Sequence, residues 1–106
     1  MKELYTLKKK KSFAYEGTLE SGMTIFYGEN REDSLYISGT QYADLIAYFK
    51  GRTVRIGAGH GKVETDSMRE WIVSHIGKAG IVSYIAAILV EEGVAEKVDM
   101  TSIYFK

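Results

Sequence analysis

The most apolar stretch of the chain begins at residue 81 and reads Ile81-Val82-Ser83-Tyr84-Ile85-Ala86-Ala87-Ile88-Leu89-Val90, with Glu91-Glu92-Gly93 directly after it. It predicts a helix that ends at Gly93, because glycine accepts the left-handed backbone conformation that closes many helices. Apolar residues fill nearly the whole circumference of this helix, and such a helix is buried. We therefore expect it to be the most buried helix of the fold. The stretch is too short to span a bilayer, so no membrane association is predicted.

The segments on either side of this helix complete a longer pattern. Its parts are, in chain order, a helix capped at Thr65, Asp66 or Ser67 that reaches about His75, the turn Gly77-Lys78-Ala79-Gly80, the buried helix, and strands at 94–98 and 102–105. Residues 89–97 have the L-x-E-E-G-hydrophobic form that is common after recognition helices. Residues 67–106 therefore resemble the helix-turn-helix and wing of winged-helix regulators.

This resemblance implies a DNA-binding function, in which the second helix enters the major groove and the wing touches backbone phosphates. The contacts would come from Lys78, Ser83, Tyr84 and, on the wing, Lys97. The charge distribution disfavours nucleic acid as a partner. Residues 63–106 hold four basic and seven acidic residues, and the whole chain balances 14 basic against 14 acidic residues. Neutralising phosphates requires an excess of cations, which this segment lacks.

The first half of the chain predicts a sheet followed by a helix and a further strand. Period-2 patterns and glycine-containing turns indicate three strands of an antiparallel meander, near residues 12–16, 23–27 and 35–37. Ser38 or Thr40 then caps a helix whose apolar stripe includes Leu45 and Phe49. Residues 53–56 predict one more strand. The predicted fold is a single α+β domain, residues 1–106, with a small antiparallel sheet and about three helices in the order β-β-β-α-β-α-α-β-β.

A glycine-rich loop lies between this strand and the next helix and gives a third functional hypothesis. Gly57, Gly59, His60, Gly61 and Lys62 would let backbone N–H groups approach an anion, and His60 would supply an acid or base to a small enzyme. The spacing matches neither a P-loop nor a dinucleotide-binding loop. Two histidines and no cysteine also lack a metal-ligand spacing. We therefore predict no catalytic residue, no metal and no cofactor.

The eight tyrosines favour a protein partner. Among them, Tyr15, Tyr27, Tyr36, Tyr42 and Tyr48 lie in the first half, and those that are exposed would suit an interface. The run Lys8 to Lys11 is expected to be solvated or to guard an edge strand. The absence of cysteine and of an apolar N-terminal segment predicts a cytoplasmic location. The favoured hypothesis is a non-enzymatic binding or regulatory module that acts through protein–protein interaction or self-association.

Overall fold

The computed structural model describes residues 1–57 and 64–106, and it has the α+β fold that the sequence predicts. Its elements are β1 (Lys2–Tyr5), β2 (Ser12–Thr18), β3 (Gly22–Tyr27), the 3-10 turn η1 (Glu29–Arg31), β4 (Asp33–Ser38), α1 (Gly39–Phe49), β5 (Thr53–Arg55), α2 (Met68–His75), the 3-10 turn η2 (Ala79–Ile81), α3 (Val82–Glu91), β6 (Ala95–Lys97) and β7 (Ser102–Phe105). The predicted order is confirmed, and strand β1 is added at its start. The strands form two sheets, whereas the sequence predicted one.

The first sheet is an antiparallel meander with the strand order β1-β2-β3-β4. The tight connection between β2 and β3 is closed by Gly22, whose φ of 114° favours glycine. A Cβ atom on Gly22 would collide with the hydroxyl of Tyr36, a residue of β4. The Tyr36 side chain reaches over β3, and its hydroxyl donates a 3.0 Å hydrogen bond to the carbonyl oxygen of Ser21. The predicted three-strand meander is thus confirmed, and β1 extends it at the edge beyond β2.

Helix α1 begins where the sequence predicts. Ser38 is the N-cap, and its hydroxyl oxygen accepts a 3.1 Å hydrogen bond from the backbone N–H of Gln41. The side chain of Gln41 in turn accepts a 2.9 Å bond from the backbone N–H of Ser38, which completes a capping box. The buried face of α1 carries Leu45 and Phe49, as the apolar stripe predicts.

The second sheet has the order β5-β7-β6 and is built by the last half of the chain. Helix α2 has Ser67 as its N-cap, one of the three residues predicted for that role. The elements that follow β5 come in the predicted order, which is α2, a turn, α3 and the β6–β7 hairpin. No helix among residues 1–57 and 64–106 has the length and apolar character needed to cross a membrane.

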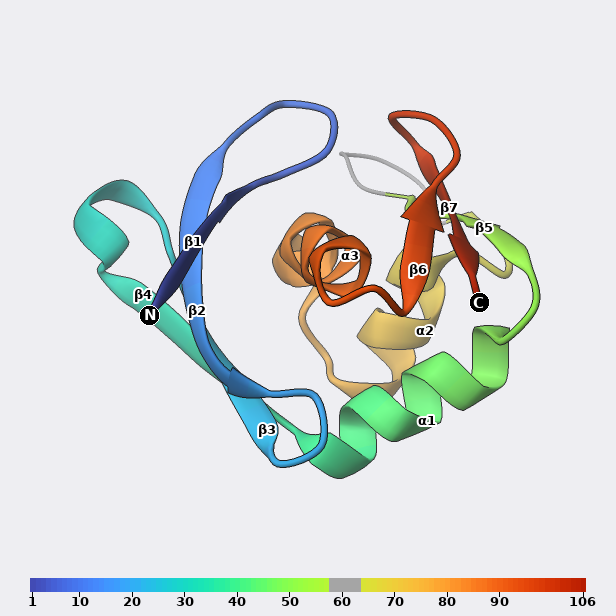
Figure 1. Cartoon of the computed structure of the whole chain (residues 1–106), viewed down its shortest axis with the longest axis horizontal. Coiled ribbons are helices and arrows are strands. Elements are labelled where there is room, and N and C mark those ends of the chain that lie inside the picture. Colours follow the sequence, from blue (N-terminus) through green and yellow to red (C-terminus); the bar gives the residue numbers. More distant parts are fainter. Residues whose placement is uncertain (58–63) are drawn as a thin grey trace.

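Helix α3 lies between the two sheets, as Figure 1 shows where the helix is seen almost end-on. Seven of its ten residues are buried, which confirms that it is the most buried helix of the three. On one side it meets the inner face of the first sheet, where the ring of Tyr84 lies 4.9 Å from that of Phe13. On the other side it packs against β6. The apolar circumference of α3 is therefore matched by apolar partners in both directions.

Candidate binding pocket between α1 and α2

Helix α3 does not offer a free surface at the residues that the winged-helix resemblance picks out. Tyr84 is only 6% exposed and lies beneath the first sheet, with its ring 5.2 Å from that of Tyr27. Ser83 is half-buried. Lys78 is exposed in the turn before α3, and its Nζ atom lies 5.3 Å from the centre of the Tyr27 ring. Lys78 and Tyr84 therefore meet at Tyr27.

The fourth residue of that set lies elsewhere. Lys97 is exposed on β6, and the α3 helix separates β6 from the first sheet (Figure 1). The structure thus brings together Lys78 and Tyr84 but places Lys97 on the opposite side of α3. The surface that a helix-turn-helix protein would turn towards a DNA groove is occupied in this chain by the four-stranded sheet.

The glycine loop lies mostly outside the described residues. Gly59, His60, Gly61 and Lys62 belong to the segment that the structure does not describe. Gly57 has a φ of 74°, and a Cβ atom there would approach the Ser67 hydroxyl oxygen to 2.9 Å. Gly57 is therefore held directly against the N-cap of α2, beside the pocket described next.

A pocket of about 240 Å³ opens between the end of α1 and the first turns of α2. Its lining residues are Tyr48, Asp66, Ser67, Glu70, Trp71, Ser74 and His75. The sequence suggested Tyr48 as an interface residue, Asp66 and Ser67 as possible caps, and His75 as the approximate end of the capped helix. It did not predict that they surround one pocket. The only signal was the i, i+4 spacing of Glu70 and Ser74, which puts two polar groups on one side of α2.

Two lining residues of the pocket, Asp66 and Tyr48, are in contact with Arg52. The guanidinium Nη1 of Arg52 lies 2.9 Å from Asp66 Oδ2, and Arg52 Nη2 donates a 3.0 Å hydrogen bond to the carbonyl oxygen of Tyr48. The Arg52 guanidinium carbon is 5.1 Å from the centre of the Tyr48 ring and 5.0 Å from that of Phe49. Both distances suit a cation–π contact. One guanidinium group is therefore held at the rim by a carboxylate and two aromatic faces.

The floor of the pocket is fixed by hydrogen bonds at the start of α2. Asp66 has a φ of 61°, a left-handed conformation that is uncommon outside glycine. Its backbone N–H donates a 2.7 Å bond to Glu70 Oε1, and the Glu70 N–H donates a 3.2 Å bond to the Ser67 hydroxyl. The Ser67 hydroxyl donates to the carbonyl oxygen of Glu64 at 2.8 Å. The Glu70 carboxylate is thus positioned by a backbone N–H group and the Asp66 carboxylate by Arg52.

Two stacked rings form the remaining wall. The rings of Trp71 and His75, one helical turn apart, have centroids 4.1 Å apart and an interplanar angle of 11°. His75 Nδ1 lies 2.8 Å from the carbonyl oxygen of Trp71. Because a carbonyl oxygen only accepts, Nδ1 is the protonated nitrogen and Nε2 remains available to another partner.

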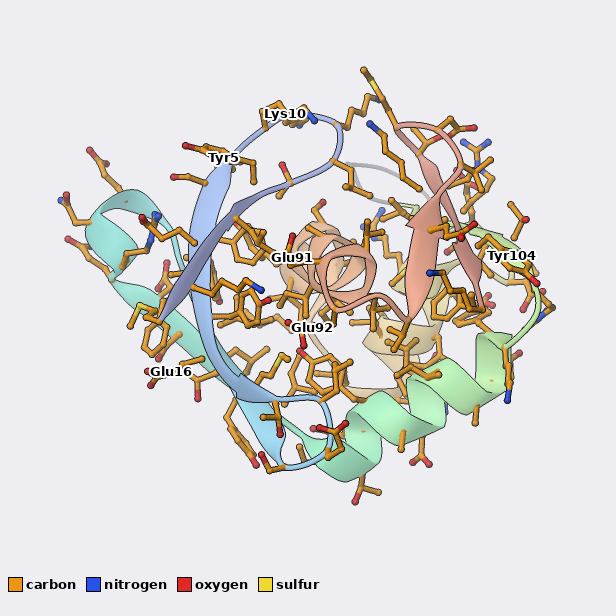
Figure 2. The ribbon with its side chains drawn as sticks, viewed as in Figure 1. Tyr5, Lys10, Glu16, Glu91, Glu92 and Tyr104 are labelled. Atoms are coloured by element: carbon orange, nitrogen blue, oxygen red, sulfur yellow. The ribbon has the colours of Figure 1, made fainter. Side chains whose placement is uncertain are left out.

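A second hollow, of about 370 Å³, lies between the N-terminus and the end of α3. Figure 2 shows Glu91 and Glu92 at that end of α3, with Glu16 on β2. Here the charges already satisfy one another: Lys2 Nζ lies 3.0 Å from Glu91 Oε2, and the Tyr15 hydroxyl donates a 2.7 Å bond to Glu92. This second hollow is therefore a structural junction between the sheet and α3.

The chemistry of the first pocket suits a positively charged group. Asp66 and Glu70 supply negative charge, and the Tyr48 ring and the stacked pair of Trp71 and His75 supply aromatic surface beside it. Within the described ranges 1–57 and 64–106, no three histidine, aspartate or glutamate side chains are arranged to hold a metal ion. No protein-family model matches the chain, and no curated protein or solved structure is similar to it.

Proposed function

We propose that this chain is a non-enzymatic protein-binding module, and that the pocket between α1 and α2 receives a basic side chain of its partner. One observation carries the proposal: Asp66 and Glu70 line the same hollow as Tyr48, Trp71 and His75. Carboxylates next to aromatic faces recognise arginine and lysine through charge and through cation–π contact.

Arg52 of the chain itself illustrates how this site takes a guanidinium group. It satisfies one carboxylate, that of Asp66, and lies over the ring of Tyr48. Glu70 is bound at one oxygen by the backbone N–H of Asp66. With two carboxylates and one guanidinium group, the pocket keeps a net negative charge. An incoming basic side chain would meet the Glu70 carboxylate and the aromatic wall.

A protein partner is favoured over DNA by the sign of this charge. Phosphate backbones would be repelled by Asp66 and Glu70, and the segment 63–106 has an excess of acidic residues. The winged-helix hypothesis also requires Tyr84 at the surface, whereas Tyr84 is buried under the first sheet. A DNA-binding regulator therefore stays the second hypothesis, and the glycine-loop enzyme the third.

The test uses Trp71, the single tryptophan of the chain, as a reporter inside the pocket. The probe is the peptide acetyl-Gly-Arg-Gly-amide, compared with acetyl-Gly-Gln-Gly-amide, in a titration followed by Trp71 fluorescence and by backbone amide chemical shifts. We expect the arginine peptide to bind with a Kd of about a millimolar, the range for a single side chain, and more weakly in high salt. The glutamine peptide should leave both signals unchanged.

The matched variants are Glu70→Gln and Glu96→Gln. Glutamine at position 70 removes the charge but keeps an oxygen to accept the bond from the Asp66 N–H, so the pocket retains its shape. Glu96 is an exposed residue on β6 and does not line the pocket. Loss of its charge should therefore not affect peptide binding. Equal responses to the two peptides, or unchanged binding in Glu70→Gln, would exclude the proposed function.

A further inference from the structure

Strand β4 forms one edge of the first sheet, and within residues 1–57 and 64–106 its only strand partner is β3. It is six residues long, Asp33-Ser34-Leu35-Tyr36-Ile37-Ser38, and its pairing with β3 is continuous from Tyr27–Asp33 to Gly22–Ser38. Every second residue of such an edge directs its backbone N–H and C=O groups away from the sheet, where they form a template for another strand.

The other three edge strands of the two sheets are protected. Strand β1 carries Lys2 and Glu3, and Lys2 is tied to the end of α3 by its 3.0 Å ion pair with Glu91. Strands β5 and β6 have three residues each, and both contain charged side chains. Short length and charged residues are the usual devices by which edge strands avoid pairing. The basic run Lys8 to Lys11 is exposed in the turn next to β1, where it adds to the protection of that edge.

Strand β4 is longer than the other edge strands and carries no charge after its first position. Its single charged residue is Asp33, at its first position, and the chain contains no proline to interrupt an edge. Its pairing with β3 has no bulge. Tyr36 is 58% exposed, and its hydroxyl is fixed to the Ser21 carbonyl oxygen, so the ring lies across the sheet face in a defined position. Both the backbone edge and this aromatic surface are open.

We propose that β4 pairs antiparallel with β4 of a second copy of this chain, so that two four-stranded sheets join into one sheet of eight strands. A two-fold axis perpendicular to the sheet keeps the apolar faces of both copies on the same side. This symmetry restricts the register, since facing residues must point to the same side of the sheet. The pairing is centred on Leu35 or on Tyr36.

Both registers avoid a conflict of charge, and this is why a second copy fits. Centred on Leu35, the pairing sets Asp33 opposite Ile37 of the second copy and Ser34 opposite its Tyr36. Centred on Tyr36, it sets Leu35 opposite Ile37 and the backbones of the two Tyr36 residues opposite each other. Neither register places Asp33 opposite Asp33 of the second copy. Two like charges directly opposite each other would destabilise the pair, and both registers avoid this. The contact is small, so we expect a dimer with a Kd of about a micromolar rather than a permanent one.

The experiment is sedimentation velocity of the whole chain over a range of concentrations, with variants at position 34. Ser34 is exposed on β4, so Ser34→Lys adds a charge to the edge without removing a buried contact. We expect the wild type to form a discrete dimer and Ser34→Lys to raise the Kd at least tenfold. The neutral variant Ser34→Thr and the variant Thr53→Lys, on the edge strand β5, should dimerise like the wild type.

Hydrogen exchange of the wild type below and above the dimerisation concentration locates the contact. We expect added protection at alternate amides of β4 and none at β1. A chain that stays monomeric at every concentration, a Ser34→Lys variant that dimerises as well as the wild type, or protection at another strand would overturn the proposal. The Glu70→Gln variant should still dimerise, so this outcome is independent of the peptide-binding test.

Discussion

The hydroxyl of Tyr15 donates a 2.7 Å hydrogen bond to Glu92 Oε2, which joins the second strand of the chain to the end of α3 across 77 positions of sequence. Tyr15 is fully buried apart from this hydroxyl region, and it lies on the face of the sheet that covers α3. Burial, followed by the bond to Glu92, holds the pKa of Tyr15 well above its usual range. The phenol therefore keeps its proton at neutral pH and donates it in the bond to Glu92.

Removal of the Tyr15 hydroxyl should lower the stability of the fold. We expect Tyr15→Phe to reduce the free energy of unfolding by about 1 kcal/mol, since the bond is charge-assisted but Glu92 is partly exposed. Urea denaturation measures the change. The control is Tyr104→Phe, which removes a hydroxyl from a partly exposed ring on β7 and should change stability little. Equal stability of Tyr15→Phe and the wild type would show that the bond contributes nothing.

Truncation inside α3 should be among the most damaging changes in the chain. Ile85 is 0% exposed, so Ile85→Ala leaves a cavity in the core and should cost about 2–5 kcal/mol. Val73 on α2 is 39% exposed, and Val73→Ala should cost well under half as much. Thermal unfolding of both variants gives the comparison. If the two variants had the same melting temperature, α3 would not be the centre of the core.

The turn between β2 and β3 should tolerate no side chain at position 22. Gly22→Ala combines the strain of a positive φ with a collision against the Tyr36 hydroxyl. Gly51 also has a positive φ, 77°, but a Cβ atom there meets nothing within 4 Å. We expect Gly22→Ala to destabilise the chain more than Gly51→Ala in urea denaturation. Adding Tyr36→Ala should recover part of the loss in Gly22→Ala, and no recovery would exclude the collision as its cause.

Asp99 should make the stability of the β6–β7 hairpin depend on pH. Its carboxylate accepts hydrogen bonds from the Thr101 N–H at 2.8 Å and the Thr101 hydroxyl at 3.0 Å. The bond from the backbone of Thr101, first of all, holds the pKa of Asp99 below its ordinary value. A lowered pKa in the folded state means that the stabilisation is present above the ordinary pKa and is lost as the pH falls through the folded-state value.

The variant Asp99→Ala should therefore melt at a lower temperature than the wild type near neutral pH, and the difference should shrink below about pH 4. Thermal unfolding followed by circular dichroism across this range measures it. Asp44→Ala, at an exposed position on α1, serves as the matched control. A difference between Asp99→Ala and the wild type that stays constant with pH would show that the turn does not depend on the ionised carboxylate.

The sequence predicted the helices and most strands because the signals for them are local. The Ser38 cap, the apolar stripe of α1 and the glycine after α3 act within one or two turns of backbone, so they can be read without knowing the fold. Strand β1 was missed because its four residues, Lys2 to Tyr5, are mostly exposed and alternate weakly. They become a strand only because the register with β2 supplies their hydrogen bonds.

The pocket was missed for a different reason. Tyr48 lies on α1, whereas Asp66 and Trp71 lie at the start of α2, and no pattern of spacing links the two helices. Their meeting depends on the bond of Arg52 to Asp66, which spans 14 positions, and on the left-handed backbone at Asp66. Taken alone, each of these residues also fits a role that needs no pocket: Tyr48 fits an interface, Asp66 a helix cap and Trp71 the hydrophobic core.

The sequence established that the helix from Ile81 to Glu92 is buried, because its apolar circumference has to leave water whatever surrounds it. It also predicted the α+β order of the elements, which the structure confirms. The tertiary structure established that the four-stranded sheet is what covers this helix and that Tyr84 faces the sheet. The hydrophobic effect is not directional, so it requires burial but does not choose the partner; the choice follows from side-chain packing between segments far apart in the chain.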